Sequence, residues 1–330
     1  MGATKEKLLY ILDILKETDE QHPVTTAQII DKLSQYSIEP ERKSVLRDIQ
    51  VLRDFGYEIV QCRDNKLGWY LAEREFEDWE LKVLIDAVQG AKFLTQKDSD
   101  NLIQKLCAQA SADSGRTLRL MTIPADAKRG DSSTKRVIDT VLTAMRSHKK
   151  VKFDYVFTDE HRRTVPKHPE GTRPVSPYAL VWRKDKYYLI ANYCEEKTLS
   201  YYRLDRIRNA EILEGEQARP LRDVMGDNGE QKLRDFVKTN VYNSKGKLIT
   251  LRLAIMSNSV DTMLDSFGTD VMVHPNGDGT LTASVPVSDS EGLYVWLLHH
   301  GQEVKVLEPE NVKNEFVRRL KTMLSNYEEA

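Results

Sequence analysis

Several features that would place this 330-residue chain in a specialised class are missing from its sequence. It has no run of about 18 apolar residues, the length that a membrane-spanning helix needs, and acidic residues interrupt the apolar positions near its N-terminus, unlike in a signal peptide. It has only three cysteines, Cys62, Cys107 and Cys194, whose spacing fits neither a metal site nor a disulfide framework. We therefore expect no membrane as a partner and a reducing, cytoplasmic environment.

The signatures of common enzyme sites are also missing. There is no G-x-x-x-x-G-K-[ST] phosphate loop, no G-x-G-x-x-G, no G-x-S-x-G and no H-E-x-x-H. His299 and His300 are adjacent, so on a helix they would diverge by about 100° and make poor joint metal ligands. Residues 276–279 lack the carboxylates of a calcium loop. We expect no catalytic residue, no metal, no cofactor and no enzymatic activity.

Charge is present but unevenly distributed. The whole chain carries −2, yet residues 135–210 contain 17 basic and 9 acidic side chains, a net charge of +8. Residues 1–72 and 73–134 carry −2 each, and residues 211–330 carry −6. Such a basic segment suggests a domain that binds a polyanion. Alternatively, the basic segment could pack against the acidic segments that flank it in the chain. The length suggests two or three domains.

The N-terminal segment has the pattern of a winged helix-turn-helix. Apolar spacing predicts a helix over 5–18, and a capping box that starts at Thr25 predicts a second helix. Pro40 suits the first turn of a third helix, which should end at Gly56. Two short strands around residues 63–66 would form the hairpin wing.

The third predicted helix has an apolar face and a basic face. Val45, Ile49 and Leu52 share one side, whereas Lys43 and Arg47 point the opposite way. Such a helix can enter a major groove, while the wing reaches the phosphate backbone. The alternative is an ordinary three-helix bundle with a solvated charged face. The candidate contacts to duplex DNA are Thr26, Arg42, Lys43, Ser44, Arg47, Gln50 and Lys66.

The stretch RKSVLRDIQVLRDFGYEI resembles the recognition helix and wing of helix-turn-helix regulators related to the DeoR type. The resemblance implies that this domain binds double-stranded operator DNA. A DNA-binding protein with one helix-turn-helix usually binds paired half-sites as a dimer, so we expect a homodimer.

The region after this domain is rich in helical spacing. Apolar residues recur at intervals of three and four over 79–93, 102–106 and 137–145. Residues 110–131, which include Gly115, are expected to be irregular. These helices would form either a core of their own or the seam of the dimer.

Farther along the chain, the apolar period changes to two. Alternating segments over 151–157, 174–181, 186–191, 201–207 and 210–213 predict five strands of a small β-barrel. Aromatic and basic residues interleave along them, as stacking on nucleotide bases beside fixed positive charge requires. A single tyrosine is more often part of a core, but the cluster together with the net charge favours ligand binding.

Two stretches, SPYALVWRKDKYYLIANY and SYYRLDRI, closely resemble the WYL domain of bacterial transcriptional regulators. The name motif corresponds to Tyr187, Tyr188 and Leu189, and Ser200 stands where many relatives have arginine. The resemblance implies an Sm/SH3-like barrel that senses an anionic ligand, either a nucleotide or a short single-stranded nucleic acid, and changes DNA binding. The candidate ligand contacts are Arg173, Ser176, Tyr178, Tyr187, Tyr188, Arg203 and Arg206.

The last segment predicts the order β-α-β-β-α-β and then a long helix over 309–327, which is a ferredoxin-like arrangement. A hairpin is expected around 276–279. This order resembles the C-terminal extension found after WYL domains in the same regulators.

These patterns together predict an α+β multidomain protein that acts as a ligand-responsive bacterial transcriptional regulator. The alternative is a nucleic-acid-binding scaffold that binds single strands through the barrel and uses its N-terminal module for assembly. The expected domains are a winged helix-turn-helix over 1–72, a helical connector over 73–133, a WYL barrel over 134–215, and a linker helix with the C-terminal extension over 216–330.

Overall fold

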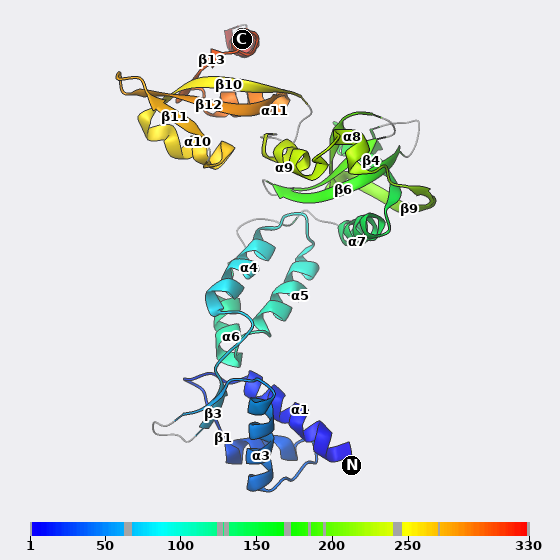
Figure 1. Cartoon of the computed structure of the whole chain (residues 1–330), viewed down its shortest axis with the longest axis vertical. Coiled ribbons are helices and arrows are strands. Elements are labelled where there is room, and N and C mark those ends of the chain that lie inside the picture. Colours follow the sequence, from blue (N-terminus) through cyan, green and yellow to red (C-terminus); the bar gives the residue numbers. More distant parts are fainter. Residues whose placement is uncertain are drawn as a thin grey trace. The chain divides into compact units, whose positions relative to one another are not determined.

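The computed structural model shows a mixed α/β protein of several domains (Figure 1). It divides into two compact units, Met1–Ser132 and Ser133–Ala330. Within the residues that the structure describes, no helix is both long and apolar enough to cross a membrane. The described residues are 2–62, 68–123, 128, 132–167, 173–183, 186–193, 196–239, 246–269 and 271–328.

The first domain combines three helices with a small antiparallel sheet of order β1-β3-β2. The capping box at Thr25 is confirmed: its hydroxyl accepts from the Gln28 N–H at 3.2 Å, and the Gln28 side chain accepts from the Thr25 N–H at 2.8 Å. Pro40 was expected inside the third helix, but Glu41 is the N-cap, so Pro40 precedes the helix. The elements are α1 (Gly2–Lys16), β1 (Val24–Thr25), α2 (Thr26–Ser34), α3 (Arg42–Asp54), β2 (Ile59–Gln61) and β3 (Gly68–Leu71).

The three helices bury one common core. The apolar stripe of α3 lies at its centre and packs against the inner sides of α1 and α2 and against the sheet. At about 25 cal/mol per Å² of apolar surface removed from water, this burial is the main source of the domain's stability. The buried members are Ile11, Leu12, Ile14, Leu15, Val24, Ile29, Leu33, Val45, Ile49, Leu52, Ile59, Trp69 and Leu71.

Three further helices complete the first unit, and one of them was not expected. They are α4 (Asp78–Gly90), α5 (Gln96–Cys107) and α6 (Ala112–Leu120). The prediction that 110–131 is irregular is wrong over α6, whose N-cap Ser111 accepts from the Ser114 N–H at 3.2 Å. Gly115 is not a helix breaker here: a Cβ at this position would lie 2.5 Å from the Cys107 carbonyl oxygen, so glycine allows α6 to pack closely on the end of α5.

The second unit begins with a helix and a six-stranded antiparallel sheet. The strand order is β5-β4-β6-β7-β8, and β9 also pairs with β4. The predicted strand over 201–207 is interrupted by a short 3-10 turn, η1 (Leu204–Arg206), in which the side chain of Leu204 is fully buried. The elements are α7 (Ser132–Arg146), β4 (Lys149–Thr158), β5 (Thr164–Pro166), β6 (Arg173–Arg183), β7 (Lys186–Tyr193), β8 (Leu199–Arg203) and β9 (Ile207–Gln217).

Both faces of this sheet are covered around β7. Leu189 and Ala191 point into the cluster that α7 closes, whereas Ile190 points into a second cluster on the opposite face. The second cluster is closed by α8 (Leu221–Met225) and α9 (Gly229–Thr239). This explains why β7 is continuously apolar over Leu189–Ala191 rather than alternating. We refer to the face under α8 and α9 as the outer face.

The C-terminal domain has the β-α-β-β-α-β order that the sequence predicts, followed by a long helix. Its sheet has the order β11-β12-β10-β13 and is antiparallel throughout. The hairpin between β11 and β12 uses Gly277 at φ +81° and Gly279 at φ +84°, where a side chain would be strained. The elements are β10 (Lys247–Met256), α10 (Val260–Phe267), β11 (Met272–Pro275), β12 (Thr280–Asp289), α11 (Glu291–His299), β13 (Val304–Glu308) and α12 (Glu310–Glu328).

Candidate nucleic-acid interface and effector site

The helix α3 presents a polar face on the side away from the domain core. The side chains of Arg42, Lys43, Arg47 and Gln50 are exposed. Gln50 also donates to a carboxylate oxygen of Asp54 at 2.7 Å, one turn farther along the helix. Because the opposite face is buried, these exposed side chains are among those of α3 that another molecule can reach.

Two other predicted contacts have partners inside the domain. The Ser44 hydroxyl accepts a hydrogen bond from the ammonium of Lys7 on α1. Thr26 is buried, and its hydroxyl accepts from the Trp69 indole N–H at 3.2 Å. The structure thus gives both hydroxyls a role in holding the domain together. Lys66 lies outside the described residues.

A buried ion pair beneath α3 was missed by the sequence reasoning. The Lys7 ammonium lies 2.8 Å from a carboxylate oxygen of Asp48, and their side chains are only 9% and 14% exposed. The pair joins α1 to the middle of α3, so it sets the position of the helix that carries Lys43 and Arg47. A signal was present: Lys7 stands one helical turn before Ile11, within the apolar stripe of α1.

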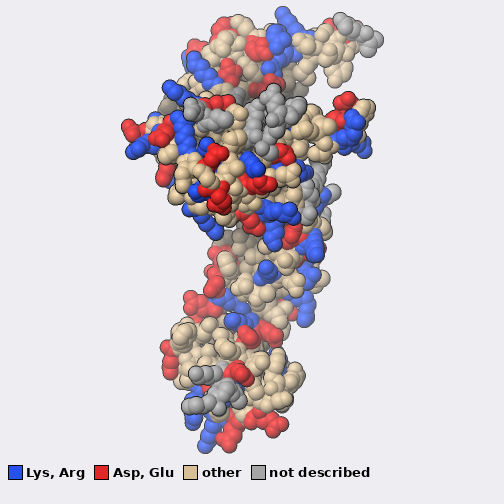
Figure 2. Space-filling model, turned by 90° about the vertical axis from the view of Figure 1, so that its right-hand side faces the viewer, with Lys and Arg blue, Asp and Glu red and all other residues tan. Residues whose placement is uncertain are grey.

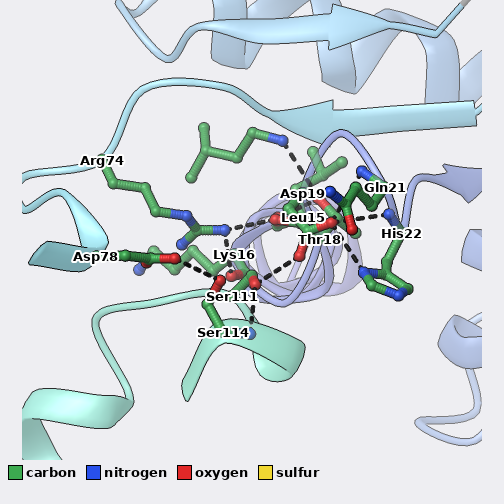
Figure 3. Close-up of polar contacts among 11 residues, drawn as sticks. Leu15, Lys16, Thr18, Asp19, Gln21, His22, Arg74, Asp78, Ser111 and Ser114 are labelled. Atoms are coloured by element: carbon green, nitrogen blue, oxygen red, sulfur yellow. Dashed lines mark hydrogen bonds and ion pairs between the residues drawn. The ribbon is translucent and has the colours of Figure 1, made fainter. Parts of the chain in front are cut away.

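The first domain is tied to α6 by a polar junction (Figure 3). The guanidinium of Arg74 donates to the carbonyl oxygens of Lys16 at 2.9 Å and Thr18 at 2.5 Å, which caps the C-terminal end of α1. Asp19 accepts from the Ser111 hydroxyl at 2.6 Å. Ser111 is the N-cap of α6, so the segment that follows α1 is hydrogen-bonded to the start of α6.

The carboxylate of Asp19 is the most heavily bonded group at this junction. Besides Ser111, it accepts from the His22 N–H at 2.8 Å and from the His22 ring at 2.9 Å. Burial acts to raise the pKa of Asp19, but the hydrogen bonds from Ser111 and His22 outweigh it and hold the pKa below its ordinary value. The charged form is therefore favoured in the folded state.

This shift predicts an acid-sensitive first unit. A carboxyl group whose pKa is lowered by folding stabilises the protein above its unfolded pKa of about 4, and that contribution is lost as the pH falls through the folded pKa. We expect Asp19→Asn to lower stability at pH 7 by roughly 1.5–3 kcal/mol and to flatten the loss of stability below about pH 4. Urea unfolding followed from pH 7 to pH 3 measures both effects. Asp13→Asn, at a 72% exposed side chain on α1, is the control, and an equal pH profile for the two variants would refute this role of Asp19.

The predicted effector residues fall into separate groups in the second unit. Tyr188 on β7 is paired in register with Arg203 on β8. The guanidinium of Arg203 is already held by the Asp205 carboxylate, through contacts of 3.0 and 2.7 Å. The hydrogen bonds to Asp205 raise the pKa of Arg203. Burial acts to raise the pKa of Asp205, but the hydrogen bonds from Arg203 outweigh this effect, and the pKa of Asp205 is lowered. Arg203 therefore already has an internal anion as its partner.

Tyr155 on β4 completes this group and was missed from the sequence. Its hydroxyl accepts from the Arg203 N–H at 3.1 Å and interacts with the Arg206 side chain on η1. Burial raises the pKa of this phenol, so the hydroxyl stays neutral. Tyr155 lies 48 positions before Arg203, so no local signal in the sequence connects the two residues.

Ser176 and Tyr178 instead form hydrogen bonds with the segment that leads from the six-stranded sheet to α8. The Arg219 N–H donates to the Ser176 hydroxyl at 2.9 Å, and the Tyr178 hydroxyl donates to the Arg219 carbonyl oxygen at 2.7 Å. Burial raises the pKa of Tyr178 to about 12. Tyr187 packs against the α7-side core, on the face opposite to Tyr188, and the side chain of Arg173 lies outside the described residues.

The basic segment 135–210 is partly neutralised by acidic residues that follow it. Lys150 pairs with Glu216 at 2.9 Å and Lys152 with Glu211 at 2.8 Å, both between β4 and β9. Figure 2 shows basic and acidic side chains interspersed over the face drawn rather than separated by sign. Docking of the basic segment on an acidic flank thus accounts for these two lysines. Among the described residues, no group of three or more histidine, cysteine or acidic side chains could hold a metal ion.

Comparison with known protein families identifies two domains in the chain. Residues 136–212 match the WYL domain, and residues 247–324 match the WCX domain. The first match covers most of α7 and most of the six-stranded sheet, and the second covers the C-terminal domain up to the last turn of α12.

A curated relative spans nearly the same length. It is the uncharacterized HTH-type transcriptional regulator YobV of Bacillus subtilis (strain 168), 21% identical over 304 residues, which cover 87% of this chain and 90% of the relative. Among solved structures, proteasome accessory factor B/C (PafBC) of Arthrobacter aurescens is 21% identical with a TM-score of 0.27; the match covers 97% of this chain and 46% of that protein, less than half of its length. A CRISPR Cas-related protein is 11% identical with a TM-score of 0.40 and coverages of 78% and 75%. Both TM-scores are too low to support an argument from structure.

Proposed function

The chain belongs to the WYL-domain transcriptional regulators, and on this premise we propose that it binds double-stranded operator DNA through its first domain and an anionic effector through its WYL domain. The effector is a nucleotide or a short single-stranded nucleic acid. In this proposal the first domain is a winged helix-turn-helix, the six-stranded sheet an Sm/SH3-like barrel and the last domain ferredoxin-like. The protein acts in the cytoplasm as a homodimer, without catalysis.

The observation that carries the DNA-binding part is the division of α3 into two faces. Its apolar face is buried, and the Lys7–Asp48 pair holds it from below, so the exposed face is rigidly presented. Two cations, Lys43 and Arg47, lie one turn apart on that exposed face. Arginine and lysine in such positions can contact guanine edges or phosphates in a major groove.

The observation that carries the effector part is the group formed by Tyr155, Arg203, Asp205 and Arg206. An anion that reaches Arg203 must replace the Asp205 carboxylate or bind beside it. Because Asp205 and Arg206 both lie on η1, binding of an anion there would shift this turn and the strand ends that it joins. The charge-assisted bonds to Arg203 are of the type that anions form most strongly.

A selection of genomic duplex fragments by the purified protein tests the proposed function. We expect enrichment of a palindrome or of paired repeats, as a dimeric reader requires. Adding short single-stranded oligonucleotides should change this enrichment. If no duplex is enriched but oligonucleotides bind tightly, the protein is a single-strand-binding scaffold, and the proposed regulation is wrong.

Arg203→Ala should remove the effector response while operator affinity without effector stays near its wild-type value. Coupling between two sites is typically about 1–3 kcal/mol, so the wild-type response should be roughly a 5- to 150-fold change in operator affinity. Titration of operator with and without a short single-stranded oligonucleotide measures it. Arg163→Ala is a matched control, because Arg163 pairs with Asp159 at 2.8 Å on the exposed turn before β5. Loss of basal operator binding by Arg203→Ala would show that the barrel itself grips the operator.

A further inference from the structure

The C-terminal end of α9 lies against the outer face of the sheet. The Tyr201 hydroxyl donates to the carbonyl oxygen of Phe236 at 3.2 Å. The guanidinium of Arg183 donates to the carbonyl oxygen of Val237 at 2.7 Å. The last carbonyl groups of a helix have no hydrogen-bond partner within the helix and carry partial negative charge. On this sheet, the guanidinium of Arg183 and the hydroxyl of Tyr201 therefore bind the negatively polarised C-terminal end of α9.

An aromatic ring of α9 is stacked on the same face. The rings of Phe236 and Tyr201 are 5.0 Å apart between centroids and inclined by only 12°. Tyr188 meets the Tyr201 ring edge-on, with centroids 6.2 Å apart and an angle of 90°. Near-parallel stacking of this kind is how single-stranded nucleic acids place their bases on protein aromatics.

The strand register places these groups beside the effector residues already described. Tyr188 pairs with Val181 on β6 and with Arg203 on β8. Arg183 stands two residues from Val181, and Tyr201 stands two residues from Arg203. Because side chains alternate along a strand, Arg183 and Tyr201 point to the same side of the sheet as Tyr188. The outer face therefore combines two arginines with two tyrosines, and α9 covers part of it.

The helix α9 is weakly anchored for a segment that covers a site. No residue of α9 is fully buried. Its apolar contacts are made by Leu233, Phe236 and Val237, which pack at the edge of the outer-face cluster. A short helix with few buried contacts opens at low cost compared with the rest of a domain.

We propose that the outer face, with Arg183, Tyr188, Tyr201 and Arg203, is a binding site for a ligand that joins a planar aromatic ring to an anionic group, and that α9 occupies this site as an internal substitute until the ligand displaces it. The Phe236 ring takes the place of the ligand's ring, and the carbonyl end of α9 takes the place of its anion. Since α9 connects the barrel to the domain that begins at β10, its release passes the signal to the C-terminal domain. This inference rests on the proposed function and specifies how its effector site is regulated.

Removing the internal ring tests the competition in the full-length protein. The probe is a 5′-phosphorylated single-stranded thymidine pentanucleotide with a fluorophore at its 3′ end, and binding is followed by anisotropy. A stacked aromatic pair contributes about 0.5–1.5 kcal/mol, so Phe236→Ala should bind the probe roughly two- to tenfold more tightly than wild type. Phe157→Ala, at a 42% exposed ring on β4, is the matched control and should leave the affinity unchanged.

Hydrogen exchange of the α9 amides, with and without saturating probe, separates the outcomes. Loss of protection in α9 on binding, together with tighter binding by Phe236→Ala, supports the inference. Binding with unchanged α9 protection and unchanged affinity of Phe236→Ala overturns it and leaves the proposed function standing. If neither wild type nor a folded Phe236→Ala variant binds the probe, this effector class, and with it the proposed sensing, is wrong. Phe236→Leu, which keeps the apolar packing but removes the stack, replaces Phe236→Ala if the alanine variant does not fold.

Discussion

Replacing both Lys43 and Arg47 by alanine should reduce the affinity for operator duplex roughly 30-fold or more. Each side chain is exposed on α3, on the side opposite to the buried stripe. A cation that contacts a base edge or phosphate contributes about 1–3 kcal/mol, so two lost contacts correspond to at least about 2 kcal/mol. Gel-shift or anisotropy titrations of the selected operator, at two salt concentrations, measure the loss, because contacts to phosphate also set the salt dependence.

A matched control separates a local contact from a change in net charge. Lys97→Ala with Lys105→Ala removes the same two charges from the exposed side of α5 in the same unit. This control should bind operator almost as the wild type does. Equal losses in the two double variants would mean that only the overall charge matters. If the Lys43 and Arg47 variant keeps its DNA affinity but no longer assembles, the first domain is an assembly device.

Lys7→Met should cost about 3–5 kcal/mol of the free energy of unfolding of the first unit. The substitution keeps the length of the side chain but leaves the Asp48 carboxylate, only 14% exposed, without its cation. A buried charge that loses its partner is strongly destabilising, whereas replacing both partners by apolar groups is often neutral. Adding Asp48→Leu to Lys7→Met should therefore recover most of the stability. Hydrogen exchange of the α1 and α3 amides in the intact chain measures the free energies.

The exposed pair of Lys32 and Glu17 provides the comparison for this effect. Their side chains are 43% and 60% exposed at a distance of 2.8 Å, so Lys32→Met should cost less than about 1 kcal/mol. The Lys7→Met variant should also bind operator more weakly, because α3 loses the contact that sets its position. A cost no larger than that of Lys32→Met would contradict the role assigned to the buried pair.

Short-range signals in the sequence were sufficient wherever a feature depends on neighbouring residues. The start of α2 follows from Thr25 and Gln28, which cap the helix through contacts three residues apart. The end of α3 follows from Gly56, whose φ of +116° suits a residue without a side chain. The resemblance of two stretches to the WYL domain is shown by the family match over 136–212.

Side-chain direction was less predictable for the candidate site. Ser44 was assigned to DNA by its place in α3, yet its hydroxyl bonds to Lys7, 37 positions away in the chain. Tyr187 and Tyr188 are adjacent and were assigned together, but alternation along β7 sends them to opposite faces of the sheet. Gly115 was interpreted as a sign of irregular structure, although it is required by the approach of α6 to Cys107.

The sequence was enough to place the WYL domain before the C-terminal domain. It also predicted the alternation of the strands and the two faces of α3, because these patterns depend on the periods of helix and strand. Only the folded chain showed that Asp48 lies over Lys7, that Arg203 is held by Asp205, and that the end of α9 rests on Arg183 and Tyr201. The first and the last of these contacts join residues that lie on separate elements far apart in the chain, and the second depends on how η1 packs beside β8. Tertiary packing sets which polar groups meet, and with it which charges are already paired when a ligand arrives.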